Sequence, residues 1–322
     1  TGGAITIDLD GLVAGDLDSL NEGDKVTIDG KEVTYKGDAT ATGLNITQSE
    51  YVADGKQVIY KAGDGYILIT WPTQAGGSYL VTLHDVDIDI TGTGDIDAIN
   101  IFGQLDITLE GENILKAPRN AINSSNSSPK IILRGDGLID MESSLCGIRA
   151  ESGYVTIQDN VVLSSKGAKW GVVGGYYEDV LIKDNAKIDI SVRPDESNFE
   201  NYAIRCGNLY VKGDAKVDTN GEHPFISTRI GVEVDPTARL NAIVRGVLGS
   251  TYWAHTVYGT VTILENITAD FGASFQLNGP FSASEGASLI NNGTIKFIDG
   301  VSVEQLKALN ITNKGTLMLG SK

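Results

Sequence analysis

The chain has 322 residues, of which 42 are acidic and 25 basic, so its net charge is −17, and 41% of its residues are hydrophobic. This apolar content can bury a core and argues against wholesale disorder. The low number of Lys and Arg argues against a nucleic-acid partner or an anionic membrane surface. No apolar run reaches the roughly 18 residues of a transmembrane helix, so we expect no membrane insertion. Because no charged-then-apolar leader opens the sequence, we expect a mature or excised segment.

The N-terminal part of the chain is rich in hairpin signals. Within residues 1–75, short strand-like stretches are separated by Asp-Gly turns, as in KVTIDGKEVTY at 25–35. An Asp-Gly pair between two alternating stretches is a strong signal for a two-residue β-hairpin. We therefore predict an N-terminal β cap, or a small β-domain, over residues 1–75.

The middle of the chain is repetitive. An alternating apolar stretch followed by Gly, Asp or Asn recurs with anchor residues from position 83 to position 234 in six steps, which average about 25 residues. The anchors are Leu83, Leu109, Leu133, Ile157, Ile182, Val211 and Val234. A second signal, in most copies a small residue followed by Ile or Val, follows each of the first six anchors. Its apolar residues are Ile99, Ile122, Ile148, Val172, Ile204 and Ile226.

Each period holds three short stretches of alternating apolar residues. No stretch with the 3.6-residue apolar periodicity of a helix is long enough to predict one. Such strands cannot bury their inner faces alone but can do so by stacking, which is typical of a solenoid. We predict an all-β chain whose residues 76–300 form a right-handed parallel β-helix with three strands per coil; the hand follows from the chirality of parallel crossover connections. An antiparallel β-sandwich also has short, evenly spaced strands, but it would not keep the fixed phase of this repeat.

Two places depart from the repeat. One enlarged step places an insertion at residues 191–201, which we expect to bulge from a turn. At the C-terminal end, SVEQLKAL at 302–309 begins with Ser302 and has Gln305 three residues later, a capping-box pattern that predicts one helical turn. We predict a C-terminal cap over residues 301–322.

The repeated phrase is clearest in GDGLIDMESSLCGIRAESGYVTI at 135–157 and DVLIKDNAKIDI at 179–190. Over roughly residues 80–230 it resembles the pectate-lyase-like β-helix domains of bacterial cell-surface proteins, a carbohydrate-binding type. The resemblance implies an extracellular domain, secreted or attached to the cell surface. In that family, aspartates just before the Gly-Ile step often ligate calcium, and Asp97 occupies such a position here.

Aromatic and basic residues at equivalent positions of successive coils suggest a sugar-binding flank. Pyranose rings stack on aromatic rings, while Arg side chains donate to hydroxyl groups. The predicted carbohydrate-binding residues are Trp170, Tyr202, Arg149, Arg205, Tyr176 and Tyr177. In the alternative interpretation, Trp170 and Tyr202 turn inward and fill the core.

The acidic stretch that starts at residue 84 offers a weaker prediction of a metal site. Asp87 and Asp89 flank Ile88 and share one strand face. Together with Asp97 they could supply oxygen ligands for Ca²⁺, although a solvated strand face explains the same pattern. We expect no required cofactor, with calcium as the one candidate. We also predict that Cys146 and Cys206 are free thiols, because they lie two coils apart.

The leading functional hypothesis is a non-catalytic bacterial surface domain that binds a polysaccharide, a host or cell-wall glycan, along its flank. A polysaccharide lyase or glycoside hydrolase with its site near the 191–201 insertion is the first alternative. A structural stalk or an adhesin with a protein receptor is the second. No nucleophile-elbow or phosphate-loop motif is present.

Overall fold

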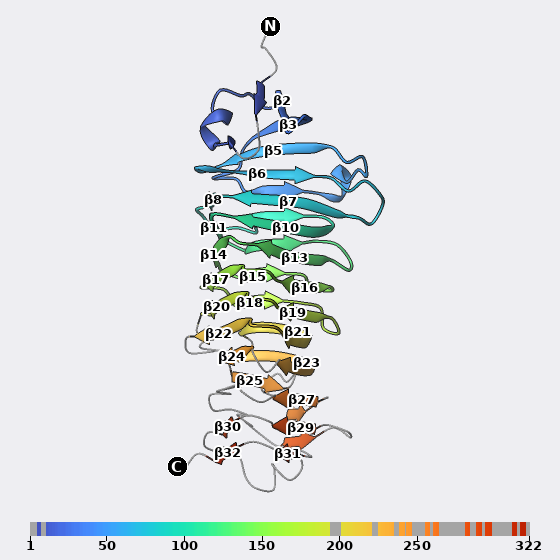
Figure 1. Ribbon diagram of the computed structural model, residues 1–322, viewed down its shortest axis with the longest axis vertical. Coiled ribbons are helices and arrows are strands. Elements are labelled where there is room, and N and C mark those ends of the chain that lie inside the picture. The colour runs from blue at the N-terminus through green and yellow to red at the C-terminus, as the bar shows by residue number, and fades with distance from the viewer. Residues whose placement is uncertain are drawn as a thin grey trace.

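The computed structural model describes the side chains of residues 11–193 and 201–219, together with those of 226, 227 and 238. It also describes the backbone of residue 220 and of strands at 5–7 and between residues 225 and 319. Figure 1 shows a stack of short strands with the N-terminus at one end of the long axis and the C-terminus at the other. The fold is all-β, and its strands wind into a parallel β-solenoid, as the repeat predicts.

Each regular coil contributes three strands. The first strands of the coils are β7 (Ser78–His84), β10 (Gln104–Glu110), β13 (Lys130–Gly135), β16 (Tyr154–Ile157) and β19 (Asp179–Ile182). The second strands form a seven-stranded parallel sheet: β8 (Asp87–Asp89), β11 (Glu112–Ala117), β14 (Leu138–Ser143), β17 (Val162–Lys166), β20 (Lys187–Ser191), β22 (Lys216–Asn220) and β24 (Arg239–Asn241). The third strands are β9 (Ile99–Ile101), β12 (Asn120–Ser124), β15 (Cys146–Arg149) and β18 (Trp170–Val173).

Two longer strands each join the third strand of one coil to the first strand of the next. They are β21 (Tyr202–Val211) and β23 (Phe225–Val234). The pairing of β21 with β23 shifts register between Cys206 and Asn208, so this joint carries a β-bulge.

Stacked apolar columns form the core. The predicted small-residue-plus-Ile signal is confirmed, because Ile99, Ile122, Ile148, Val172 and Ile204 pair in register from coil to coil and are fully buried. β-branched side chains suit this arrangement, since they pack well on a pleated surface with one buried face. At about 25 cal/mol per Å² of apolar area, such columns dominate the stability of a solenoid.

The first predicted column contains one error of register. Leu83 pairs with Leu109 as expected, but Leu133 pairs with Ile107, and Gly135 lies opposite Leu109. The shift is two residues, and because side chains alternate with a period of two, Leu133 still points into the core. The remaining anchors, from Leu133 to Val234, pair as predicted.

The N-terminal region is built differently from the middle. Its elements are β1 (Ile5–Ile7), η2 (Ala14–Leu17), β2 (Lys25–Ile28), β3 (Lys31–Asp38), β4 (Leu44–Ile46), η3 (Gln48–Glu50), β5 (Gln57–Ala62) and β6 (Gly65–Thr70). The Asp-Gly hairpin at 25–35 is confirmed, since β2 pairs antiparallel with β3 around Asp29 and Gly30, both with positive φ. β6 also pairs antiparallel with both of its neighbours, β5 and β7. A hydrophobic cluster around Leu17, Val33 and Tyr66 is distinct from the main core.

Parallel pairing continues towards the C-terminus. Its strands are β25 (Ile243–Gly246), β26 (His255–Val257), β27 (Thr260–Ile263), β28 (Phe281–Ala283), β29 (Ser288–Asn291), β30 (Thr294–Phe297), β31 (Ile311–Asn313) and β32 (Thr316–Leu319). The helical turn predicted at 302–309 lies outside the described residues, as do positions 194–200 of the predicted insertion. That insertion falls between β20 and β21, where a turn was expected. Within the described part of the chain, no helix is long and apolar enough to cross a membrane.

Candidate functional site

The predicted aromatic column is present on the third strands. Trp170 pairs in register with Tyr202, and Cys146 occupies the same position one coil earlier. Both aromatic side chains are half-buried, so neither is enclosed in the core. The Trp170 ring is flanked by cations, with Lys169 Nζ 5.1 Å and Arg205 Cζ 5.7 Å from its centroid. These cations interact with the ring, which reduces the ring area open to a ligand.

The two predicted arginines share one outward column. Arg149 pairs with Val173, and Val173 pairs with Arg205, so Val173 separates the two arginines in the column. Arg149 also forms an ion pair with Glu151. The structure therefore places four of the six predicted residues on the same strip, with the basic side chains already engaged by protein groups.

The other two predicted residues project from a short loop, residues 174–178, which we call the Tyr-Tyr loop. Tyr176 and Tyr177 are 38% and 62% exposed, and their ring centroids lie 5.1 Å apart at an interplanar angle of 85°. The loop is held on both sides. Gly175 N donates to Gly153 O at 2.7 Å, and Gly207 N donates to Glu178 O at 2.8 Å. These bonds to both neighbouring coils hold the two exposed rings at the corner of the solenoid.

Next to this loop the structure shows a depression that the sequence analysis did not predict. It has a volume of about 500 Å³ and lies on the outer face of β13, β16, β19 and β21. Thr156, Leu181 and Tyr210 pair in register and form its floor, and Tyr154 lines one edge with 43% of its surface exposed. We call this depression the tyrosine groove. Tyr154 and Tyr210 lie two coils apart, which is about 10 Å at the usual strand spacing.

The tyrosine groove and the Tyr-Tyr loop are connected through two side chains. The Tyr154 hydroxyl interacts with the carboxylate of Glu178, the residue that follows Tyr177. Hydrogen bonding to Glu178 raises the pKa of Tyr154, with smaller contributions from the negative charge of Glu178 and from burial. Tyr154, Tyr176 and Tyr177 therefore belong to one corner of the solenoid, and Glu178 orients the first of them.

Charged and amide groups line the edges of the tyrosine groove. Lys130 lies at one edge and Lys183 and Lys212 at the other. Lys183 pairs with Asp184 at 3.4 Å, and the Lys212 Nζ atom lies 5.0 Å from the Tyr210 ring centroid. Asp179 accepts a hydrogen bond of 2.9 Å from the Asn208 amide. Aromatic faces beside fixed hydrogen-bonding groups are what a site needs to bind rings that carry hydroxyl groups.

A sequence signal for this groove existed. Thr156, Leu181 and Tyr210 each directly precede an anchor residue, so alternation places them on the outer face of three successive coils. The prediction from the aromatic residues of the third strands missed this groove, because the groove is formed by outward positions of the first strands.

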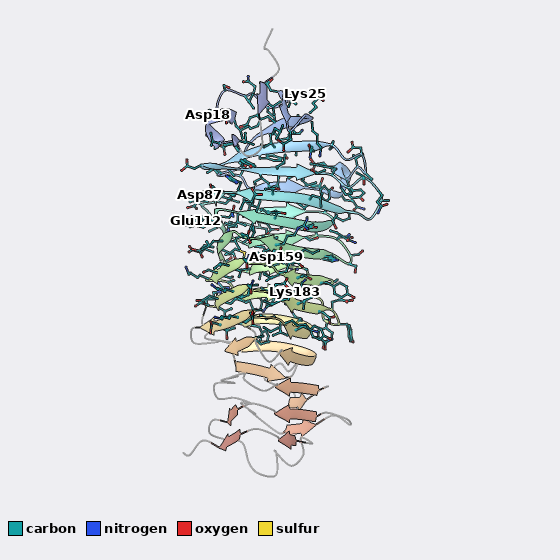
Figure 2. All side chains as sticks on the ribbon, in the orientation of Figure 1. Asp18, Lys25, Asp87, Glu112, Asp159 and Lys183 are labelled. Carbon is teal, nitrogen blue, oxygen red and sulfur yellow. The ribbon has the colours of Figure 1, made fainter. Side chains whose placement is uncertain are left out.

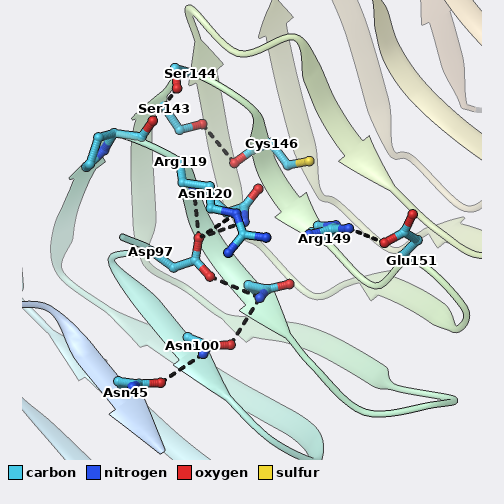
Figure 3. A network of polar contacts seen from close by, with 12 residues as sticks. Asn45, Asp97, Asn100, Arg119, Asn120, Ser143, Ser144, Cys146, Arg149 and Glu151 are labelled. Carbon is cyan, nitrogen blue, oxygen red and sulfur yellow. Dashed lines mark hydrogen bonds and ion pairs between the residues drawn. The ribbon is translucent and has the colours of Figure 1, made fainter. Parts of the chain in front are cut away.

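Asp97 lies in a network of amide groups, shown in Figure 3. One carboxylate oxygen accepts hydrogen bonds from the backbone and side chain of Asn120, at 3.1 and 2.7 Å, and the other accepts one of 3.0 Å from Asn123. The chain of amides continues from Asn123 to Asn100 and Asn45. Arg119 approaches to 3.9 Å. A cation at Asp97 would have to compete with these donors.

The other two candidate calcium ligands lie elsewhere. Asp87 and Asp89 project from β8 on one exposed face, as predicted, and Asp89 pairs with Lys116 at 3.4 Å. Asp89 also borders a second depression of about 450 Å³ whose lining includes Lys116 and Glu142. No group of three or more metal-ligating side chains occurs among the described residues. Calcium binding by Asp87, Asp89 or Asp97 stays a prediction.

The cysteines are confirmed as free thiols, and both are buried. Burial raises the pKa of Cys146 to about 12 and raises that of Cys206 as well. A thiol that holds its proton is a poor nucleophile and a poor metal ligand. The two cysteines are therefore packing residues of the solenoid.

Comparison of the chain with protein-family models, with curated proteins and with solved structures finds no match.

Proposed function

We propose that this protein binds a polysaccharide along the flank that carries the tyrosine groove and the Tyr-Tyr loop, and that it does so without cleaving the chain. The observation that carries the proposal is the row of Thr156, Leu181 and Tyr210 on the outer faces of successive coils, with Tyr154 at its edge, beside the exposed rings of Tyr176 and Tyr177. A solenoid repeats its surface at the strand spacing, so it presents such groups in a row. An extended polymer can contact several of these regularly spaced groups at once.

The chemistry of the flank supports a sugar ligand. Tyrosine rings offer apolar faces for the C–H faces of pyranoses, and their hydroxyl groups offer hydrogen bonds at the edge. Lys130, Asp179 and Thr156 add donors and acceptors within the same depression. The resemblance of the repeat to pectate-lyase-like carbohydrate-binding domains supports the same ligand class and favours a place outside the cell, secreted or attached to the surface.

The strip around Trp170 would extend this surface. Trp170, Tyr202 and Arg205 lie on β18 and β21, across the Tyr-Tyr loop from the tyrosine groove. A polymer that leaves the groove at the corner would meet Tyr176 and Tyr177 before it met this strip. We therefore place the main contacts in the groove and on the loop, and secondary contacts at Trp170 and Tyr202.

The experiment is a glycan array combined with pull-down on insoluble polysaccharides, with and without Ca²⁺. The variants are Tyr154→Ala/Tyr210→Ala for the groove and Tyr176→Ala/Tyr177→Ala for the loop. Leu138→Ala is the matched control, because Leu138 is an exposed apolar side chain on the second-strand sheet. We expect each tyrosine pair to lower the affinity about tenfold or more and the control to leave it unchanged.

Each alternative function has its own signature in this experiment. Release of new reducing ends or of unsaturated products from the bound glycan would show that the protein is an enzyme and would contradict the non-catalytic proposal. A protein that binds no glycan in either calcium condition would instead be a stalk or an adhesin with a protein receptor, and the proposal would be wrong.

A further inference from the structure

We infer that a second copy of this chain docks on the outer face of the seven-stranded sheet, with the two solenoids side by side and running in opposite directions. The surface consists of the outward side chains of β8, β11, β14, β17, β20 and β22, and we call it the second-strand face. These strands follow one another down one side of the stack (Figure 1). The tyrosine groove lies on the first strands, so the inference concerns a different surface and does not depend on the proposed function.

The charged side chains of the second-strand face are sorted along the solenoid axis. The first three strands carry five carboxylates and one lysine, and the next three carry three lysines and two carboxylates: Asp87, Asp89, Glu112, Asp140, Glu142 and Lys116, then Lys166, Lys187, Lys216, Asp189 and Asp218. Figure 2 shows Asp87 and Glu112 on one side of the stack, in successive coils. The face therefore has an acidic half and a weakly basic half.

Two ion pairs within the chain neutralise part of this charge. Asp89 pairs with Lys116, and Asp140 pairs with Lys166, each at 3.4 Å. All four side chains are more than 40% exposed, so these pairs are weak. Lys166 can therefore contact a second carboxylate without a large cost.

The charges that remain lie at opposite ends of the face. In the part of the chain that the structure describes, Glu112 and Glu142 form no ion pair in the acidic half, and neither do Lys187 and Lys216 in the basic half. All four side chains belong to exposed residues. A face with separated opposite charges is complementary to a second copy of itself when the order of the coils is reversed.

A two-fold axis between β14 and β17, lying in the face and parallel to the strands, gives this reversal. It keeps each outward column opposite the same column of the second copy, so β14 faces β17 and β11 faces β20. Glu112 and Lys187 share one column, and Glu142 and Lys166 share another. Glu112 therefore faces Lys187 of the second copy, and Glu142 faces Lys166 of the second copy. By symmetry each of these contacts occurs twice.

The centre of the face is apolar. Leu138 is 36% exposed and pairs in register with Val162, which is half-buried. Ile114 is half-buried in the neighbouring column. The two-fold axis passes between Leu138 and Val162, so each of them packs against the other's counterpart in the second copy. An apolar centre within a charged rim is the usual arrangement of a protein interface.

The outermost strands limit the affinity of this contact. Asp87 and Asp218 share a column at the two ends of the face, so the same axis places them opposite each other. Six strands about 4.8 Å apart span roughly 24 Å, and five residues of a strand span roughly 17 Å, so the contact covers a few hundred Å² per copy. This size is at the lower end for specific interfaces, and we expect a dissociation constant in the micromolar range.

The dimer leaves the tyrosine groove of each copy open, because the groove lies on the first strands. Each groove also belongs wholly to one copy. Loss of the dimer therefore leaves the affinity of a single groove for a soluble glycan unchanged, and the two proposals fail separately.

Sedimentation equilibrium of the full chain, from about 1 µM to about 1 mM, tests the inference. The variants are Glu112→Lys/Glu142→Lys, which makes the acidic half basic, and Lys166→Glu/Lys187→Glu, which makes the basic half acidic. We expect the wild type to dimerise as its concentration rises and each variant alone to dimerise about tenfold or more weakly. An equimolar mixture of the two variants should restore the dimer, because opposite charges then face each other again.

The matched control is Glu22→Lys/Asp54→Lys, which makes the same change of charge at exposed carboxylates outside this face. It should dimerise like the wild type, and an effect as large as that of Glu112→Lys/Glu142→Lys would show a general charge effect and overturn the inference. A wild type that stays monomeric up to about 1 mM would also overturn it. So would a dimer that both charge reversals leave unchanged, because its contact would lie on another surface. A monomeric mixture of two variants that circular dichroism shows to be folded would contradict the charge pairing.

Discussion

Asn120 donates two hydrogen bonds to the same oxygen of Asp97, one coil away, from its backbone N–H at 3.1 Å and from its side-chain amide at 2.7 Å. Asn123 donates a third hydrogen bond to the other oxygen. These three bonds join Asp97 to the next coil beside the core. The Asp97 side chain is buried, so its charge is stabilised by these donors and by Arg119 in place of water.

The first prediction concerns this network. Asp97→Ala removes the acceptor of three hydrogen bonds and leaves buried amide donors unpaired, so we expect a loss of roughly 2–4 kcal/mol in the free energy of unfolding. Chemical denaturation measures it. Asp95→Ala is the control, because Asp95 is exposed two residues away and should change stability by no more than about 0.5 kcal/mol. Equal effects of the two substitutions would mean that the network does not stabilise the fold.

The second prediction concerns the close approach of two sheets at Gly171. A Cβ atom here would collide with the Ile190 side chain and lie 2.5 Å from the Ala203 carbonyl oxygen. Gly171→Ala should therefore cost about 1–3 kcal/mol or more through overpacking. Gly15→Ala is the matched control, since no atom lies within 4 Å of its added Cβ. Thermal unfolding of the two variants compares them, and a Gly171→Ala protein as stable as the wild type would refute the predicted packing.

The third prediction concerns the turns after the first strands. Asp184 has a φ of 62°, and its carboxylate accepts a hydrogen bond of 3.3 Å from Asp159 N in the preceding coil. Asp184→Ala loses this bond and places a Cβ in the left-handed region without a compensating side chain, at a cost of roughly 1–2 kcal/mol. Asp184→Gly keeps the backbone conformation at low cost and should lose less. Denaturant titration should rank the glycine variant above the alanine variant, and the reverse order would contradict this explanation.

The fourth prediction concerns pH and the buried thiols. Because burial raises the pKa of Cys146 from its ordinary 9.0 to about 12, the folded protein keeps a proton that the unfolded chain releases above pH 9. The stability contributed by the neutral thiol is complete below pH 9 and is lost as the pH rises towards 12. We expect the free energy of unfolding to fall over this range.

Tyrosine burial acts in the same direction. The pKa of Tyr79 is raised to about 12, chiefly by burial and then by nearby Tyr51 and Glu50. Cys146→Ala should flatten the decline above pH 9 and Tyr79→Phe the decline above pH 10, which unfolding curves at pH 8, pH 10 and pH 12 would show. A disulfide-exchange reagent at pH 8 should label neither Cys146 nor Cys206 until the protein unfolds. Rapid labelling of the native protein would contradict the burial of the thiols.

The repeat could be predicted because stacking imposes the same demand on every coil. Each coil must present an apolar residue at the same inward position, so Ile122, Ile148 and Val172 recur at spacings that can be counted in the sequence. The error at Leu133 shows the limit of this reasoning. A shift of two residues preserves the alternation of inward and outward side chains, and alternation is the only signal available before the strands are paired.

The candidate site was predicted in part, for a related reason. Tyr176 and Tyr177 are adjacent in a polar turn, so their exposure follows from local sequence. Tyr154 and Tyr210 are 56 positions apart in the sequence, and they approach only because β16, β19 and β21 stack. The interaction of Tyr154 with Glu178 likewise joins two coils.

The sequence by itself determined the architecture of this protein, because the period of about 25 residues, the alternation within strands and the turn residues all act locally and repeat. Tertiary structure alone decided which outward side chains share a surface. Register between coils brought the groove tyrosines together, and β21 runs without interruption from Tyr202 to Val211 beside the groove. The physical reason is that burial constrains every inward position in the same way, whereas outward positions are free to differ and become neighbours only through the pairing of coils.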